Sequence, residues 1–123
     1  MTERRQRLGK QGEDIACAHL QREGINIIER NWRCAAGEVD IIAREGDDIV
    51  FIEVKTRSNL DRGLPEDAVT ATKRNRYERI AMYYLSEKSP PTSRLRFDVI
   101  AILSANGQQA LLRHHRDAFG FGG

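Results

Sequence analysis

Two apolar stretches of the sequence carry acidic and basic residues at the spacing of a β-strand. Glu38 and Asp40 are two residues apart in one stretch, and Glu53 and Lys55 are two apart in the other. Because side chains on a strand alternate between its faces, residues two apart point the same way. Pairing of the two stretches would bring three carboxylates and one ammonium together beside apolar neighbours. Charges in such surroundings are costly unless they pair or hold a metal ion.

The predicted cluster suits a hard divalent cation. Carboxylate oxygens are ligands for Mg²⁺, which keeps waters and accepts the phosphate oxygens of a substrate. Such a cation activates water and stabilises charge developing on a phosphate. Lys55 can then orient or deprotonate the water or stabilise that charge, and its protonation state stays open because burial and carboxylates shift its pKa in opposite directions. The alternative for Asp40, Glu53 and Lys55 is a set of cross-strand ion pairs on exposed strand faces.

Two helices and five strands are predicted to position these residues. Helical periodicity covers residues 8–23 and about 70–87, and strand patterns cover 25–32, 38–44, 49–55 and 95–103, with a short fifth strand at 110–112. The hairpin turn at 45–48 makes the second and third strands antiparallel neighbours. The largely apolar stretch 49–55 is typical of a central strand covered on both faces. The order predicts an α/β (α+β) three-layer sandwich with a central mixed sheet flanked by helices.

Length and charge narrow the class of protein. The 123 residues correspond to a single domain, 1–123, and we expect a frayed tail from about residue 118. The net charge is only +2, but basic residues gather at 4–10 and 73–79 whereas acidic residues gather at 38–53. This distribution suits a polyanion that approaches a cation-filled site. The alternative is a solvated surface of mixed charge.

The sequence predicts a cytoplasmic protein without a membrane segment. It holds no apolar run approaching the roughly 18 residues of a membrane span, and no apolar stretch follows its basic first residues as in an export signal. Its cysteines, Cys17 and Cys34, are therefore expected to be reduced thiols. Together with His114 and His115 they match no zinc-binding spacing, so a zinc site is not expected.

Several motifs, taken in order, resemble known families. The run Gly37-Glu38-Val39-Asp40-Ile41-Ile42, followed after a turn by Glu53-Val54-Lys55, is similar to the core of PD-(D/E)xK nucleases. Over about residues 7–119 the chain more closely resembles the YraN-like family of uncharacterised bacterial proteins, which is itself similar in pattern to archaeal Holliday-junction resolvases. The motifs that carry this resemblance are Leu8-Gly9, Gly12-Glu13, Glu29-Arg30-Asn31-Trp32, Phe51 to Arg57 and Arg96-Phe97-Asp98-Val99.

The resemblance implies a restriction-endonuclease-like fold and assigns roles within it. Asp40 matches the metal-binding aspartate of the nuclease core, Glu53 matches its second acidic ligand, and Lys55 matches its lysine. Glu13 matches an acidic residue that resolvase-like nucleases add to the metal site. From the bare sequence, Glu13 is equally well an ordinary solvated helix residue. Val39 stands where the motif's name has proline, a departure common within the fold.

Further candidates surround this set. Lys73 and Tyr77 fall where related nucleases carry a polar residue and a tyrosine, although many of those have glutamine where this chain has Lys73. Tyr77 also fits the core better than a base-stacking role, because it lies on an apolar helix face. Glu38 is either a further ligand or a surface residue paired with a basic side chain. The candidates for nucleic-acid binding are Arg57, Lys73, Arg74 and Arg76, with a solvated helix face as the alternative.

The function expected from these features is that of a nuclease dependent on Mg²⁺ or Mn²⁺. By analogy with resolvases, its partner would be branched or structured DNA, in repair or recombination, and it would act as a symmetric homodimer. The rival hypothesis is a non-catalytic nucleic-acid-binding or adaptor module that retains the fold, since a fold does not fix a function. A third reading is a structural interaction protein whose carboxylates only form ion pairs.

Overall fold

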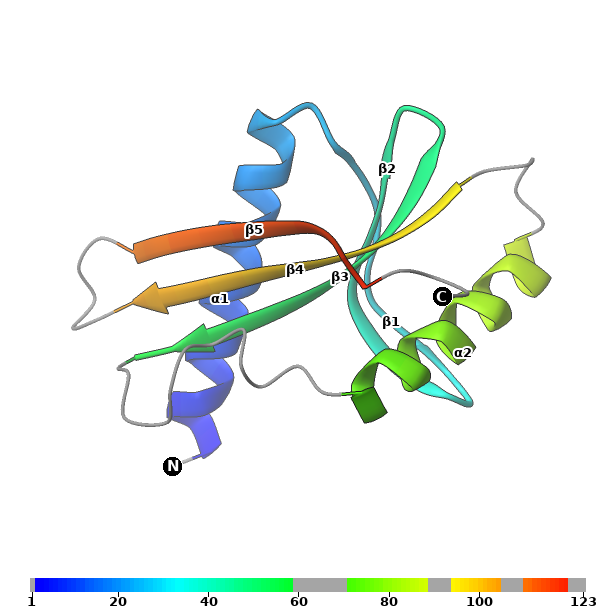
Figure 1. Cartoon of the computed structure of the whole chain (residues 1–123). Coiled ribbons are helices and arrows are strands. Elements are labelled where there is room, and N and C mark those ends of the chain that lie inside the picture. Colours follow the sequence, from blue (N-terminus) through cyan, green and yellow to red (C-terminus); the bar gives the residue numbers. More distant parts are fainter. Residues whose placement is uncertain (1, 59–70, 89–93, 105–109, 120–123) are drawn as a thin grey trace.

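The computed structural model describes residues 2–58, 71–88, 94–104 and 110–119 (Figure 1). Its elements are, in order, α1 (Thr2–Arg22), β1 (Asn26–Cys34), β2 (Gly37–Glu45), β3 (Asp48–Arg57), α2 (Ala71–Lys88), β4 (Arg94–Ser104) and β5 (Ala110–Phe119). The predicted order of helices and strands is confirmed, and most boundaries agree within two or three residues. Helix α1 starts about six residues earlier than its apolar periodicity indicates.

The last strand is much longer than predicted. The apolar pattern indicated only residues 110–112, yet β5 continues to Phe119. Its second half is polar because His114 and the backbone of Asp117 bond to a buried carboxylate instead of packing in an apolar core. The tail was expected to fray from about residue 118, but residues 118 and 119 belong to β5. Residues 120–123 lie outside the described part of the chain.

The described strands form one mixed sheet in the order β1-β2-β3-β4-β5. Strands β1, β2 and β3 follow one another antiparallel, as the tight turn between β2 and β3 predicts. Strand β4 pairs parallel to β3, and β5 returns antiparallel to β4. This mixed sheet places β3, which carries Glu53 and Lys55, at its centre.

The two helices cover opposite faces of the sheet (Figure 1). One apolar cluster joins α1 to the sheet through Ala16, Cys17, Leu20, Ile25, Ile41, Ala43, Val50, Ile52, Ile100 and Ile102. The other joins α2 to the opposite face through Val39, Ile42, Ile49, Phe51, Tyr77, Ile80, Ala81, Tyr84, Phe97 and Val99. The protein is thus an α+β three-layer sandwich of the restriction-endonuclease-like type, as predicted.

Strand β3 is covered on both faces. Val50 and Ile52 belong to the α1-side cluster, whereas Ile49 and Phe51 belong to the α2-side cluster. All four are at most 1% exposed, which confirms the prediction of a doubly covered strand. Burial of four large side chains on one short strand contributes on the order of 6 kcal/mol or more, at about 1.5–3 kcal/mol each. The strand that carries the site is therefore firmly held.

Helix α2 buries the face predicted from its periodicity. Tyr77, Ile80, Ala81 and Tyr84 are its buried residues. The Tyr77 ring packs edge-on against Phe97, with ring centroids 4.5 Å apart. Tyr77 and Tyr84 are therefore core residues, which confirms the prediction for Tyr77. Neither helix in the described ranges is long and apolar enough to cross a membrane.

Candidate acidic site

The site lies where strands β2 and β3 separate. Their pairing begins at Glu45 and Asp48 beside the turn and ends at Ile41 and Ile52. One residue further along β2, the Asp40 carboxylate accepts a hydrogen bond of 2.8 Å from the Val54 backbone N–H. The Asp40 side chain thus satisfies the Val54 amide, which lies beyond the last backbone pairing of β2 with β3. We call the point beyond Ile41 and Ile52, where β2 and β3 separate, the fork. At this fork the hydrogen bond holds Asp40 against β3.

The alternation of side chains breaks at this fork. Val39 packs in the α2-side cluster and Ile41 in the α1-side cluster, although they are two residues apart. Their partners on β1, Trp32 and Arg30, flank Asn31, which has a φ of 52°. The regular alternation on which the prediction for Glu38 and Asp40 rests therefore does not hold between Val39 and Ile41.

Glu38 is engaged elsewhere. Its carboxylate accepts a hydrogen bond from the Arg33 guanidinium across the β1–β2 hairpin. This is the surface pairing with a basic side chain that the sequence left open. Asp40, in contrast, is bonded to the backbone of β3. The two acids of β2 therefore do not act as one pair.

Glu53 lies at the centre of a dense polar cluster between β3 and α2. Its side chain is 8% exposed. One carboxylate oxygen accepts a hydrogen bond from the Tyr77 hydroxyl. The other lies 3.1 Å from the Lys55 Nζ and 3.7 Å from the Lys73 Nζ. The structure thus brings four of the predicted site residues into direct contact.

The charge on Asp40 is disfavoured in this place. Burial first, and the neighbouring Glu53 charge second, raise the pKa of Asp40 to about 7, although the Val54 N–H opposes the shift. The Glu13 charge raises this pKa further, and Lys55 lowers it. A carboxyl poised near neutral pH by burial and like charge is typical of functional sites. A bound cation would relieve both effects.

The pKa values of the two lysines shift in opposite directions. Burial and the adjacent Lys55 lower the pKa of Lys73. Burial also acts to lower the pKa of Lys55, but its contacts with Lys73 and Glu53 outweigh burial and leave it raised. Of the two ammonium groups, Lys73 therefore gives up its proton more readily than Lys55.

Glu13 approaches the fork from α1. Its carboxylate accepts a hydrogen bond of 3.2 Å from the Asn31 side-chain amide and lies 3.7 Å from the Arg30 guanidinium. Its side chain is 19% exposed. Glu13 is thus not a freely solvated helix residue. Its charge reaches Asp40, whose pKa it helps to raise.

The donor chemistry fits a hard cation, but the ligands are not gathered into a finished metal cage. Within the described ranges, no three His, Cys, Asp or Glu side chains are grouped closely enough to hold a metal ion together. The charge of Glu53 nevertheless disfavours the charge of Asp40, which is itself largely buried. Glu53 is in addition paired with Lys55 and Lys73. Carboxylate oxygens are donors that suit Mg²⁺ or Mn²⁺, and these ions fill their remaining positions with water.

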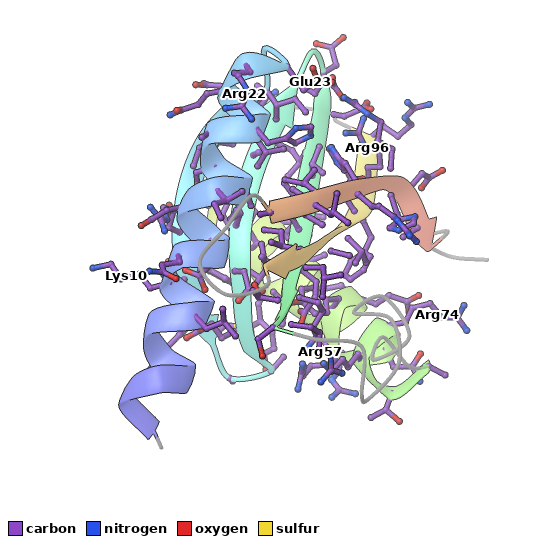
Figure 2. The ribbon with its side chains drawn as sticks, turned by 90° about the vertical axis from the view of Figure 1, so that its left-hand side faces the viewer. Lys10, Arg22, Glu23, Arg57, Arg74 and Arg96 are labelled. Carbon is purple, nitrogen blue, oxygen red and sulfur yellow. The ribbon has the colours of Figure 1, made fainter. Side chains whose placement is uncertain are left out.

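The basic candidates do not all face solvent. Figure 2 shows Arg57 and Arg74 toward one end of the molecule and Arg22 and Arg96 at the other. Lys73 contacts Glu53. The fourth candidate of the predicted set, Arg76, is half-buried: its side-chain stem packs against Gly37, and its guanidinium lies 5.9 Å from the centre of the Tyr77 ring. The stem of Arg76 therefore packs against β2, whereas Arg74 is exposed.

A second polar centre was not predicted from the sequence. Asp98 is fully buried and accepts two hydrogen bonds from Arg96, at 2.9 and 3.0 Å. It also accepts one from the Asp117 backbone N–H and bonds the His114 ring at 2.7 Å. His114 in turn bonds His19 on α1 at 3.0 Å. An Arg-x-Asp pattern inside an apolar strand is the signal that could have indicated it.

Comparison with known proteins places the chain in one family. Residues 12–102, which include every candidate from Glu13 to Tyr77, match the model of the Uncharacterised protein family UPF0102. The chain is 51% identical over 112 residues to a UPF0102 protein of Rhodococcus opacus, covering 91% of this chain and 95% of that protein. It is 46% identical to one of Parafrankia sp., covering 93% and 97% of the two chains. A third, from Dictyoglomus thermophilum, is 49% identical, with 82% and 86% covered. The chain therefore belongs to the UPF0102 family.

Proposed function

We propose that this protein is a nuclease, dependent on Mg²⁺ or Mn²⁺, that cleaves branched or structured DNA in repair or recombination. The observation that carries the proposal is the fork between β2 and β3. There a carboxylate with a pKa of about 7, Asp40, lies beside a second buried carboxylate, Glu53, which contacts Lys55. A purely structural ion pair between Glu53 and Lys55 has no need for Asp40, an additional acid, beside it.

Each residue has a distinct task in this proposal. Asp40 and Glu53 would hold the cation, with Glu13 as a third, outer carboxylate. When bound, the cation supplies a more acidic water and neutralises charge on the phosphate. Lys55 orients the water or stabilises the developing charge from its place beside Glu53. Tyr77 and Lys73 hold the Glu53 carboxylate in position from α2.

A non-catalytic nucleic-acid-binding or adaptor module is the second candidate, and one observation favours it. Both oxygens of Glu53 are already engaged, by Tyr77 on one side and by the two lysines on the other. A site in which lysines permanently neutralise the acid needs no metal. Such a protein would retain the fold and bind DNA without cleaving it.

A cleavage assay separates the two candidates. Single-stranded, duplex, flap and four-way DNAs are incubated with the protein and with Mg²⁺ or Mn²⁺, at protein concentrations that saturate binding. The nuclease proposal expects metal-dependent products from the branched substrates, with Asp40→Asn inactive as the control. Tight binding of the same DNAs without any product would establish the adaptor instead.

The proposal includes the setting in which the enzyme works. By analogy with enzymes that cut paired strands of a four-way junction, we place the activity in a C2 dimer of the 14.0 kDa chain. Sedimentation of the protein with junction DNA tests this by mass. A cytoplasmic setting agrees with Cys17 and Cys34, which are both free thiols.

A further inference from the structure

Helix α1 approaches β3 unusually closely at Gly12. A Cβ added to Gly12 would lie 2.0 Å from the Thr56 Oγ1, 3.1 Å from its Cβ and 3.3 Å from its Cγ2. Of these three atoms only Oγ1 lies nearer than 3.0 Å, so an alanine at this position would require either the Thr56 side chain to turn or α1 to move away from β3. The Thr56 Oγ1 is itself buried and has no hydrogen-bond partner among the described residues. Glycine lets α1 lie this close to β3 without either adjustment.

The contact lies next to the acidic site on both sides. Glu13 follows Gly12 on α1, and Thr56 follows Lys55 on β3. Any displacement of α1 from β3 at this point therefore moves the Glu13 carboxylate relative to Asp40. Gly9, one turn earlier on the same helix, has nothing within 4 Å of its position for a Cβ. The close approach is thus specific to Gly12.

Strand β1 holds the other side of Glu13. Asn31 adopts a left-handed backbone conformation, with a φ of 52°, which is uncommon for residues other than glycine and best tolerated by asparagine and aspartate. This conformation directs its side-chain amide to the Glu13 carboxylate, at 3.2 Å. On the neighbouring strand, Asp40 lies between the two residues that pair with Arg30 and Trp32. The irregular position of β1 thus joins α1 to the fork.

We propose that Gly12 and Asn31 are positioning residues that together seat Glu13 beside Asp40. Gly12 sets how close α1 lies to β3, and Asn31 fixes the direction of the carboxylate. In this proposal both residues act through Glu13 and not by contact with the cation or the DNA. The seating is a property of the metal-free protein, whereas the use of Glu13 as an outer carboxylate for the cation rests on the proposed function.

The first test needs no metal. The side-chain amide resonances of Asn31 are followed by nuclear magnetic resonance in the wild type and in Glu13→Gln, Gly12→Ala and Gly9→Ala. We expect the resonances to shift in Glu13→Gln and Gly12→Ala and to stay in place in Gly9→Ala, which gains helix propensity and a few degrees in Tm. A Gly12→Ala spectrum in which these resonances match the wild type would overturn the seating role of Gly12.

A compensating variant keeps this test meaningful if Gly12→Ala is poorly stable. In Gly12→Ala combined with Thr56→Ala, the two atoms beyond the Thr56 Cβ are gone, and only a tight contact of 3.1 Å remains. We expect the Asn31 amide resonances to move back toward their wild-type positions. No recovery in a folded double variant would mean that the Gly12–Thr56 contact does not set the position of Glu13.

The second test asks whether the seating serves a cation. The affinity for Mn²⁺ is measured by calorimetry for Glu13→Gln, for Gly12→Ala and for the variant that combines these two changes. Each single change should weaken binding by about tenfold, the low end of what loss of supporting groups around a metal costs. The variant that combines both changes should bind Mn²⁺ no more weakly than Glu13→Gln alone, because Gly12 acts through Glu13.

The outcomes distinguish the two claims. Additive losses of Mn²⁺ affinity in the combined Glu13→Gln and Gly12→Ala variant would contradict the action of Gly12 through Glu13. Absence of Mn²⁺ binding by the wild-type protein would remove the proposed function, while the amide resonances would still decide whether Gly12 and Asn31 seat Glu13. Asn31→Gly completes the set: it tolerates the same backbone conformation but lacks the amide, so it should weaken Mn²⁺ binding without loss of stability.

Discussion

The residue whose charge is most clearly disfavoured at the site is Asp40. Burial and the charge of Glu53 hold its pKa near 7, about three units above the ordinary carboxyl value of 3.8. The folded protein therefore binds this proton more tightly than the unfolded chain does. The resulting stabilisation is present below the ordinary pKa and is lost as the pH rises through about 7. Ionised Asp40 thus makes the metal-free protein less stable at pH 8.

Asp40→Asn should remove this pH dependence. The amide oxygen can still accept the Val54 N–H, but it carries no charge at any pH. We expect the variant to be more stable than the wild type at pH 8, by up to about 4 kcal/mol from about 1.36 kcal/mol per pKa unit, and the difference to shrink toward pH 4. Denaturant unfolding without metal measures this, with Asp47→Asn, an exposed carboxylate of the hairpin turn, as the control.

The same variant tests the metal site. Mn²⁺ should raise the Tm of the wild type by mass action and leave Asp40→Asn unchanged. An equal rise in both proteins would place the ion elsewhere. A stability difference between Asp40→Asn and the wild type that is constant from pH 4 to pH 8 would contradict the raised pKa.

Strand periodicity and the short hairpin turn were sufficient to predict that Asp40, Glu53 and Lys55 lie on neighbouring strands. They could not predict that Asp40 bonds the Val54 backbone at a fork, because alternation assumes a regular ladder. The left-handed conformation of Asn31 breaks that regularity. An asparagine inside a strand pattern gives only a weak signal for such a conformation, since most asparagines adopt ordinary backbone angles.

Among the elements, β4 and β5 are joined by the buried Asp98. Its four hydrogen bonds tie together Arg96, His114 and the backbone of Asp117. Burial acts to raise the pKa of Asp98, but the bonds to His114, Arg96 and the Asp117 backbone outweigh it and leave the pKa lowered. Its stabilising contribution is therefore present above the ordinary carboxyl pKa and is lost as the pH falls through the lowered value.

Asp98→Asn should destabilise the protein by about 1.5–3 kcal/mol, because Arg96 and His114 lose a charged hydrogen-bond acceptor. Arg96 keeps its ion pairs with Glu45 at 2.7 Å and Asp48 at 3.5 Å, so its charge is not left unpaired. Asp117→Asn is the matched control: it changes an exposed acid in a left-handed conformation that asparagine tolerates, and it keeps the backbone N–H. Urea unfolding midpoints at pH 7 measure both. Similar midpoints for the two variants would mean that the Asp98 bonds contribute little.

The same bonds explain why β5 was the element predicted least well. Apolar periodicity identified the buried faces of β3 and α2, because their cores are made of aliphatic and aromatic side chains. In the second half of β5 the residues that face the protein are polar, and their partners lie on β4 and α1. Such long-range polar contacts leave no periodic pattern in a single sequence.

At the scale of the whole molecule, the distribution of basic side chains determines where DNA could approach. Arg57 and Arg74 lie toward the end of the molecule that carries the N-terminal part of α1, opposite Arg22 (Figure 2). Arg76 is not used as a test position for DNA binding, because its stem packs against Gly37 and its substitution would also disturb this packing. Phosphate contacts release counterions, so their loss flattens the dependence of affinity on salt.

Arg57→Ala and Arg74→Ala should each weaken DNA binding across sequences and reduce the salt slope by about one unit per lost contact. Arg22→Ala should leave both quantities unchanged. Fluorescence anisotropy with labelled duplex and four-way DNA over a range of salt concentrations measures this. An equal loss in Arg22→Ala would mean that the DNA is not bound at the predicted end.

Turnover is the central claim, and Lys55→Ala tests it most directly. In this account Asp40 and Glu53 hold the cation, whereas Lys55 acts on the water or on the charge that develops at the phosphate. The measurement is the cleavage rate of four-way DNA by wild type and Lys55→Ala under single-turnover conditions with Mn²⁺, with DNA and metal affinity measured on the same samples. The account predicts a loss of about 10²-fold or more in rate with both affinities retained. It is contradicted if the wild-type protein binds the DNA at saturation and yields no product with either metal.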